Sequence, residues 1–175
     1  MASKNVLPPI RLNRIAANLL GLCVLAMPSM VHAANECPWL NEATASGLLG
    51  GSAVGEFAGV AGQPAVCTFT QHEAGGTRTL QITIEVATDP HSRLAALIQS
   101  CGTRTEPLTA IGNESVACAL DPRRKTLGER AFGRVRDQVF TITLSSSLKG
   151  DPVLNEDALK TRIYTAAEQV AGNLF

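Results

Sequence analysis

Apolar and polar residues alternate along several segments between residues 34 and 175, and such alternation is typical of half-buried strands. The clearest predicted strand covers residues 78–87. A second region predicts a hairpin of residues 130–136 and 138–146 that turns at Arg136-Asp137. Shorter strands are expected near residues 54–60, 66–71, 106–108 and 115–120.

Three other segments carry helix caps and the apolar spacing of helices. Asn41 precedes a short helix that we expect to end near Leu49, before two glycines. Asp89 followed by Pro90 predicts a second helix that runs to about Cys101. Asn155 precedes the longest helix, which has an apolar stripe of Leu159, Ile163, Ala166, Ala167, Val170 and Leu174.

The order of these elements predicts the fold class. Strands come in runs that are joined by tight turns, and the helices lie between the runs. This order favours an α+β fold over a parallel βαβ fold. We therefore predict an antiparallel sheet of about six to seven strands flanked by three helices, in a single domain of residues 34–175.

Residues 1–33 have the pattern of a secretory signal peptide. Basic residues precede an uncharged apolar run over residues 15–27, and Val31-His32-Ala33 fits the preference of signal peptidase. The run is well short of the roughly 20 apolar residues of a spanning helix. Leu22 stands before Cys23 where a lipoprotein signal carries a small residue. We predict cleavage after Ala33, no stable membrane span afterwards and a periplasmic or secreted protein; a retained anchor and a lipoprotein are the alternatives.

Charge changes when this segment is removed. The remaining 142 residues carry 12 basic and 15 acidic residues, a net charge of −3 with the histidines neutral. So mild a balance gives no general attraction to nucleic acid or to anionic membranes. We therefore expect no nucleic-acid partner.

Four cysteines remain after cleavage: Cys37, Cys67, Cys101 and Cys118. An even number of cysteines in a short exported chain indicates a disulfide framework. The gaps of 30, 34 and 17 residues lack the close ligand pairs of structural zinc sites, so no metal is expected. Four cysteines allow three connectivities, of which the strand and helix patterns favour the sequential pairs Cys37–Cys67 and Cys101–Cys118.

Short motifs along this region resemble those of PsbP-like α/β/α sandwich domains, as found in small bacterial secreted or lipoprotein-type proteins of unknown function. They are the run from Cys37-Pro-Trp-Leu-Asn-Glu-Ala to Leu48-Leu49-Gly50-Gly51, then Cys67-Thr-Phe, Leu108-Thr-Ala-Ile-Gly-Asn-Glu-Ser, the predicted hairpin and the last helix. The resemblance implies the sandwich fold, the character of a binding module and a bond between Cys37 and Cys67. It transfers no catalytic residue, and Cys101 and Cys118 are additions to the pattern.

Candidate chemistry is sparse. The glycine-rich residues 47–62 match neither a P-loop nor a dinucleotide loop, so no cofactor is expected. His72 and His91 show no nucleophile or acid at a spacing that indicates a triad. The only local concentration of charge could bind an acidic partner, a polyanionic glycan or lipid head groups. It consists of Arg123, Arg124, Lys125, Arg130, Arg134 and Arg136, the last three at one strand parity.

These patterns lead to one prediction of function and two alternatives. The first is an exported, non-enzymatic binding or accessory domain that contacts an envelope protein, glycan or lipid through its open sheet face or hairpin loops. The second is a secreted inhibitor of a hydrolase, for which the loop of residues 121–128 would have to protrude. A hydrolase ranks third, because it needs a pocket in which histidine, serine and acidic groups converge.

Overall fold

The computed structural model describes residues 36–102, 104–121 and 126–175. Three helices and seven strands form in this part of the chain, which confirms the predicted α+β fold with an antiparallel sheet. In chain order they are α1 (Glu42–Leu49), β1 (Val54–Ala58), β2 (Ala65–Glu73), β3 (Gly76–Val86), α2 (Pro90–Ile98), β4 (Glu106–Pro107), β5 (Glu114–Ala119), β6 (Leu127–Val135), β7 (Gln138–Ser146) and α3 (Glu156–Gly172).

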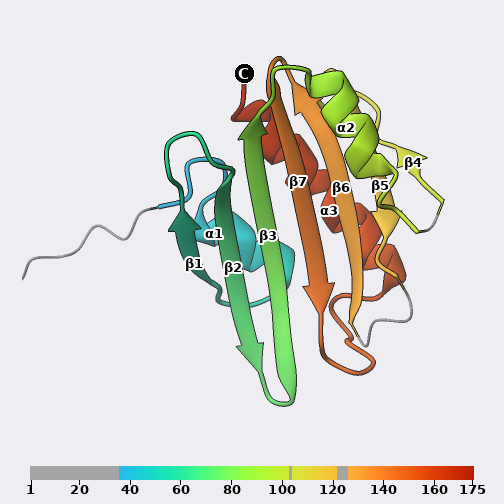
Figure 1. Cartoon of the computed structure of the whole chain (residues 1–175). Coiled ribbons are helices and arrows are strands. Elements are labelled where there is room, and N and C mark those ends of the chain that lie inside the picture. Colours follow the sequence, from blue (N-terminus) through green and yellow to red (C-terminus); the bar gives the residue numbers. More distant parts are fainter. Residues whose placement is uncertain (1–35, 103, 122–125) are drawn as a thin grey trace, which may run out of the picture. The chain divides into compact units, whose positions relative to one another are not determined.

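The strands form one sheet in the order β1-β2-β3-β7-β6-β5-β4, and each pairs antiparallel with its neighbours (Figure 1). The long strands β3 and β7 lie side by side at its centre, although a helix and three strands separate them in sequence. Their register pairs Leu80 with Leu144 and Ile82 with Ile142, so the apolar positions of both strands face the same side. Antiparallel alternation then sends the threonines of both strands to the other side.

The two faces of the sheet are covered unequally. Helices α1 and α3 lie behind the sheet in Figure 1 and bury one face in the main core. On the other face α2 lies over β6 and β7, where Leu94 packs with Cys118, Phe132 and Val139. No helix in the described part of the chain covers this face over β1, β2 and β3 (Figure 1).

Helix boundaries follow the capping residues. Asn41, Asp89 and Asn155 each accept a hydrogen bond from the backbone N–H three residues later, and Gly50 ends α1 with a φ of 77°. Helix α2 ends at Ile98, three residues before the predicted end near Cys101. The chain instead forms a turn there, in which the Ser100 hydroxyl donates to the Leu97 carbonyl at 2.5 Å.

Two disulfides join helical or loop segments to strands: Cys37 bonds to Cys67 and Cys101 bonds to Cys118. They are the sequential pairs that the strand and helix patterns favour. Cys37–Cys67 ties the entrance of α1 to β2, and Cys101–Cys118 ties the turn after α2 to β5. Both bonds fit a protein that folds in an oxidising compartment.

Candidate binding face

The side of the sheet that bears α2 carries an array of small polar side chains on three adjacent strands, and no helix of the described residues lies over two of them, β2 and β3 (Figure 1). Strand register places Thr70, Thr79 and Ser145 in one row across β2, β3 and β7. Neighbouring rows add threonines at other positions and one glutamine. We call this array the hydroxyl face; it consists of Thr68, Thr70, Thr79, Gln81, Thr83, Thr141, Thr143 and Ser145.

Hydroxyl groups on this face have few partners within the protein. Thr143 Oγ1 accepts a hydrogen bond from Arg130 Nε at 3.3 Å. Among the described residues, the other six hydroxyls and the Gln81 amide make no hydrogen bond to the protein. Their donors and acceptors therefore face water, or a ligand that replaces it.

Two pairs of opposite charges lie around the hydroxyl face. Glu85 accepts from Arg93 of α2 at 2.5 Å, and this contact raises the pKa of Arg93. Glu114 accepts from Arg134 Nε at 3.4 Å. No side chain of the hydroxyl face itself ionises, but Glu56 of β1 pairs with Thr68 and Arg130 of β6 pairs with Thr143, so one acidic and one basic residue flank the face.

Both edges of the sheet are blunted. On the outermost strand β1 the Gly55 N–H donates to Glu42 of α1 at 2.8 Å, and just before this strand the Ala53 N–H donates to Ser46 at 2.9 Å. At the opposite edge β4 has only two residues, of which one is Pro107. Short strands, prolines and capped backbone groups disfavour the addition of a strand by another chain. A partner is therefore expected to bind the face of the sheet rather than its edge strands.

The predicted basic cluster is only partly brought together. Arg130 and Arg134 share a face of β6 and are half-buried, with Arg130 over the Phe132 ring at 5.7 Å. The prediction that Arg136 shares this face was wrong, because β6 ends at Val135 and Arg136 lies in the hairpin turn with a φ of 57°. Its guanidinium lies 5.8 Å from the Phe175 ring. Arg123, Arg124 and Lys125 lie outside the described residues.

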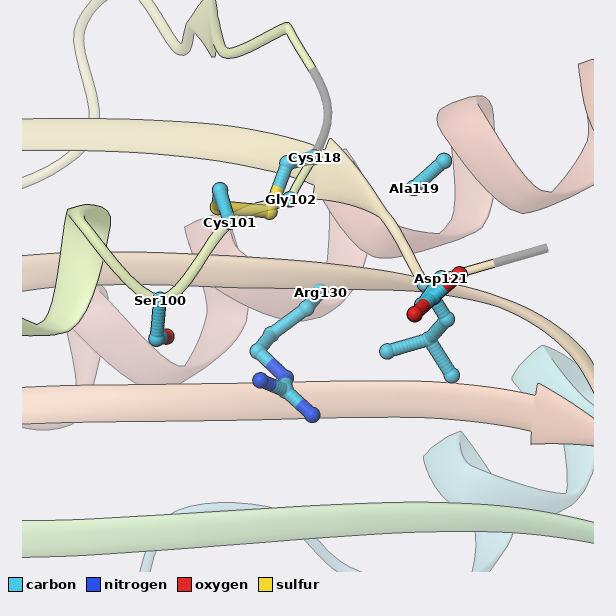
Figure 2. Close-up of a pocket in the computed structure, with 8 residues that line it drawn as sticks. Ser100, Cys101, Gly102, Cys118, Ala119, Asp121 and Arg130 are labelled. Atoms are coloured by element: carbon cyan, nitrogen blue, oxygen red, sulfur yellow. A yellow bond between two sulfur atoms is a disulfide. The ribbon is translucent and has the colours of Figure 1, made fainter. Parts of the chain in front are cut away.

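A small cavity of about 160 Å³ lies beside Arg130, between the turn after α2 and the end of β5. Figure 2 shows the Cys101–Cys118 disulfide on one side of it and the Arg130 guanidinium extending between Ser100 and Asp121. The cavity thus has a cationic, an anionic and a hydroxyl group on its wall. Arg130, which lines the cavity, pairs with Thr143 of the hydroxyl face in the strand register.

A larger cavity of about 360 Å³ lies at the start of α1, over Phe69 and the Cys37 end of the other disulfide. Glu36, Asn41 and Glu42 form its polar rim. The residues that line it include Gly55, where a Cβ atom would come within 2.8 Å of the Phe69 ring. Neither cavity is lined by His72 or His91.

A buried polar cluster on the opposite side of the sheet ties β3 to the segment before α3. The sequence patterns did not predict it. Arg78 of β3 binds both carboxylate oxygens of Asp151, at 2.7 and 2.9 Å, and donates to Gln71 at 2.8 Å. Asp151 also accepts from Ser146 at 2.6 Å and from two backbone N–H groups before α3. Burial alone would raise the pKa of Asp151, but these hydrogen bonds outweigh it and hold the pKa well below its usual range.

Every polar group of this cluster has a partner, so the cluster is a brace rather than a site. In the described part of the chain, no buried side-chain nitrogen or oxygen lacks a hydrogen bond. The sequence did contain one indication: Arg78 stands at the strand parity of Leu80 and Ile82, which face the core. Nothing in the sequence indicated that Asp151 would be its partner.

The histidines form no catalytic arrangement. His72 lies exposed in β2, and the His91 side chain, 68% exposed, contacts Glu114 at 3.1 Å. Within residues 36–102, 104–121 and 126–175, no three His, Cys, Asp or Glu side chains are grouped as metal ligands would be. No helix among these residues is long and apolar enough to cross a membrane.

Comparison of the chain with protein-family models, with curated proteins and with solved structures finds no match. The resemblance to PsbP-like domains therefore rests on the short motifs alone and stays a prediction. The chemistry of the hydroxyl face is the remaining basis for a functional conclusion.

Proposed function

We propose that this chain is an exported, non-enzymatic binding module that contacts a component of the cell envelope through its hydroxyl face. Export is supported by the pattern of residues 1–33 and by the two disulfides, which are typical of oxidising compartments. The observation that carries the proposal is the sheet face beside α2, with six hydroxyls that have no partner among the described residues.

The rest of the fold supports a rigid platform. The sheet is braced behind by the main core and by the Arg78–Asp151 cluster, and each disulfide fixes a segment to a strand. Threonine side chains have few χ1 rotamers, so a ligand that binds them loses little side-chain entropy. A platform of this kind binds a partner without a conformational change.

Affinity capture tests the proposal. The purified, disulfide-bonded protein is immobilised and exposed to envelope extract, beside the variant Thr79→Arg/Thr83→Arg, which places two bulky charges on the hydroxyl face. Thr161→Arg on α3, on the opposite side of the sheet, is the matched control.

We expect the wild type and Thr161→Arg to retain the same components, and the double variant to lose them. Equal recovery by all three proteins would remove the hydroxyl face from the proposal. A second comparison replaces Arg130, Arg134 and Arg136 by glutamine, and unchanged recovery there would exclude the arginines as the main contact.

A further inference from the structure

Resting on the proposed function, we propose that the ligand of the hydroxyl face is a neutral polysaccharide that lies across β2, β3 and β7. Each threonine or serine hydroxyl donates one hydrogen bond and accepts two, and Gln81 at the middle of the array both donates and accepts. Sugar hydroxyls have the same double character. A chain of sugars therefore matches every group of this face without leaving a donor opposite a donor.

The spacing of the array suits a polymer. Neighbouring strands lie about 4.8 Å apart and alternate residues along a strand about 6.7 Å apart, so the hydroxyls repeat in two directions. The middle row runs from Thr68 through Gln81 to Thr143 and leads to Arg130. Several weak contacts made by one polymer add up through a high effective concentration, so no single contact has to be strong.

Other classes of partner fit this face poorly. Protein interfaces are centred on aromatic, methionine or arginine side chains, and the hydroxyl face contains none. Strand addition by a peptide is disfavoured by the capped edge at β1 and the short edge at β4. Lipid surfaces and nucleic acids select apolar or cationic side chains, whereas this face is polar, with one acidic and one basic residue, Glu56 and Arg130, at the ends of its middle row.

The cavity beside Arg130 is consistent with the same ligand (Figure 2). Its wall combines the Arg130 guanidinium with the Asp121 carboxylate and the Ser100 hydroxyl, so its charges balance. A polyanion would gain from the arginine but would be repelled by the aspartate. Both charged groups already interact within the protein, so a sugar hydroxyl would share them with those partners.

Direct binding measurements test this inference. The assay is affinity electrophoresis of the disulfide-bonded protein. Dextran, galactomannan and a soluble neutral xylan are the neutral probes, and alginate and heparin are the anionic comparators. The variant Thr68→Val/Thr79→Val/Thr83→Val keeps the shape of each side chain and removes three hydroxyls. Gln81→Met removes the amide, and Thr161→Val on α3 is the control. Circular dichroism and thermal melting confirm that each variant is folded.

We expect the wild type and Thr161→Val to bind at least one neutral probe equally well. Each lost hydroxyl should weaken binding between about twofold and tenfold, so the triple variant should bind at least about tenfold more weakly. Raising the salt from about 0.1 M to about 1 M shortens the Debye length from about 10 Å to about 3 Å and should leave this binding unchanged.

Three results would overturn the inference: no binding to any neutral probe, equal binding by the triple variant and the control, or salt-sensitive binding to the anionic probes only. If envelope capture still depends on Thr79 and Thr83 while the neutral probes fail, the inference falls and the proposed function stands. If capture is also independent of this face, both fall.

Discussion

Replacing Asp151 by asparagine removes one charge from a pair that ties β3 to the segment before α3. Arg78 is 3% exposed and Asp151 is 5% exposed, and two hydrogen bonds of 2.7 and 2.9 Å join the guanidinium to the carboxylate. In the variant the guanidinium stays buried with its main counter-charge gone. Among the described residues, only Glu73, at 3.4 Å and partly exposed, remains as an acidic neighbour.

The size of the effect follows from that burial. Removing one partner of a buried ion pair costs about 3–5 kcal/mol, because the other charge is left without compensation. A domain of this size is stable by about 5–15 kcal/mol, so the variant should lose a large share of its stability. At roughly 3–5 °C for each kcal/mol, the melting temperature should fall by about 10–25 °C.

The pH dependence gives the same variant a second signature. The pKa of Asp151 is lowered in the folded protein, so the pair stabilises the fold above the unfolded pKa of about 3.9 and loses this effect as the pH falls towards the folded value. The variant lacks that titration. Its stability should therefore differ most from the wild type near neutral pH, and the difference should shrink below about pH 4.

Urea unfolding followed by circular dichroism, at several pH values, measures both quantities. Asp137→Asn, at an exposed position of the β6–β7 turn, is the matched control and should change the free energy of unfolding by less than about 0.5 kcal/mol. If Asp151→Asn is as stable as this control at neutral pH, or if the difference between them is as large at pH 2 as at pH 7, the buried pair does not brace the fold as described.

Three further substitutions test packing and burial elsewhere. Gly47→Ala, inside α1 with no atom within 4 Å of the added Cβ, should stabilise the protein by up to about 1 kcal/mol, measured by thermal melting. Gly133→Ala should destabilise it by about 1–3 kcal/mol in the same assay, since its Cβ would come within 2.8 Å of Ser115 and closer still to the Phe140 ring; equal melting of the two variants would contradict the packing described for β6. Glu129→Gln should stabilise the protein near pH 7, because burial raises the pKa of Glu129, with Lys160 opposing this and Glu106 adding to it. Urea unfolding should show a gain of about 1.4 kcal/mol for each unit by which the folded pKa of Glu129 exceeds its unfolded pKa. The gain should vanish below about pH 4, where the carboxyl group is protonated in both states. A gain that persists in acid would refute this cause.

Local patterns predicted most of this fold because local interactions set its boundaries. The side chains of Asn41, Asp89 and Asn155 cap the helices at the predicted positions, and alternation in β3 and β7 sends apolar residues to the core side. Helix α2 ends earlier than predicted, since the turn at Ser100 brings Cys101 to Cys118. Apolar spacing alone does not contain that constraint.

The candidate site was harder to predict because it depends on strand order. The sequence showed threonines alternating in single strands, but only the pairing of β3 with both β2 and β7 assembles them into one array. The prediction of the basic cluster was wrong for Arg136 for a local reason. Strand parity joined Arg136 to Arg130 and Arg134, whereas the hairpin turn begins at Val135 and rotates Arg136 away. Local sequence patterns do not indicate long-range pairs such as that of Arg78 with Asp151.

Chemical-shift mapping tests the central claim most directly. Isotope-labelled, disulfide-bonded protein is titrated with a neutral polysaccharide that it binds, and the backbone and threonine methyl signals are followed. We expect the largest chemical-shift changes at Thr68, Thr79, Thr83 and Thr141, and no changes in α1 and α3. Shifts confined to residues 126–128, to α3 or to the cavity at the start of α1 would contradict it.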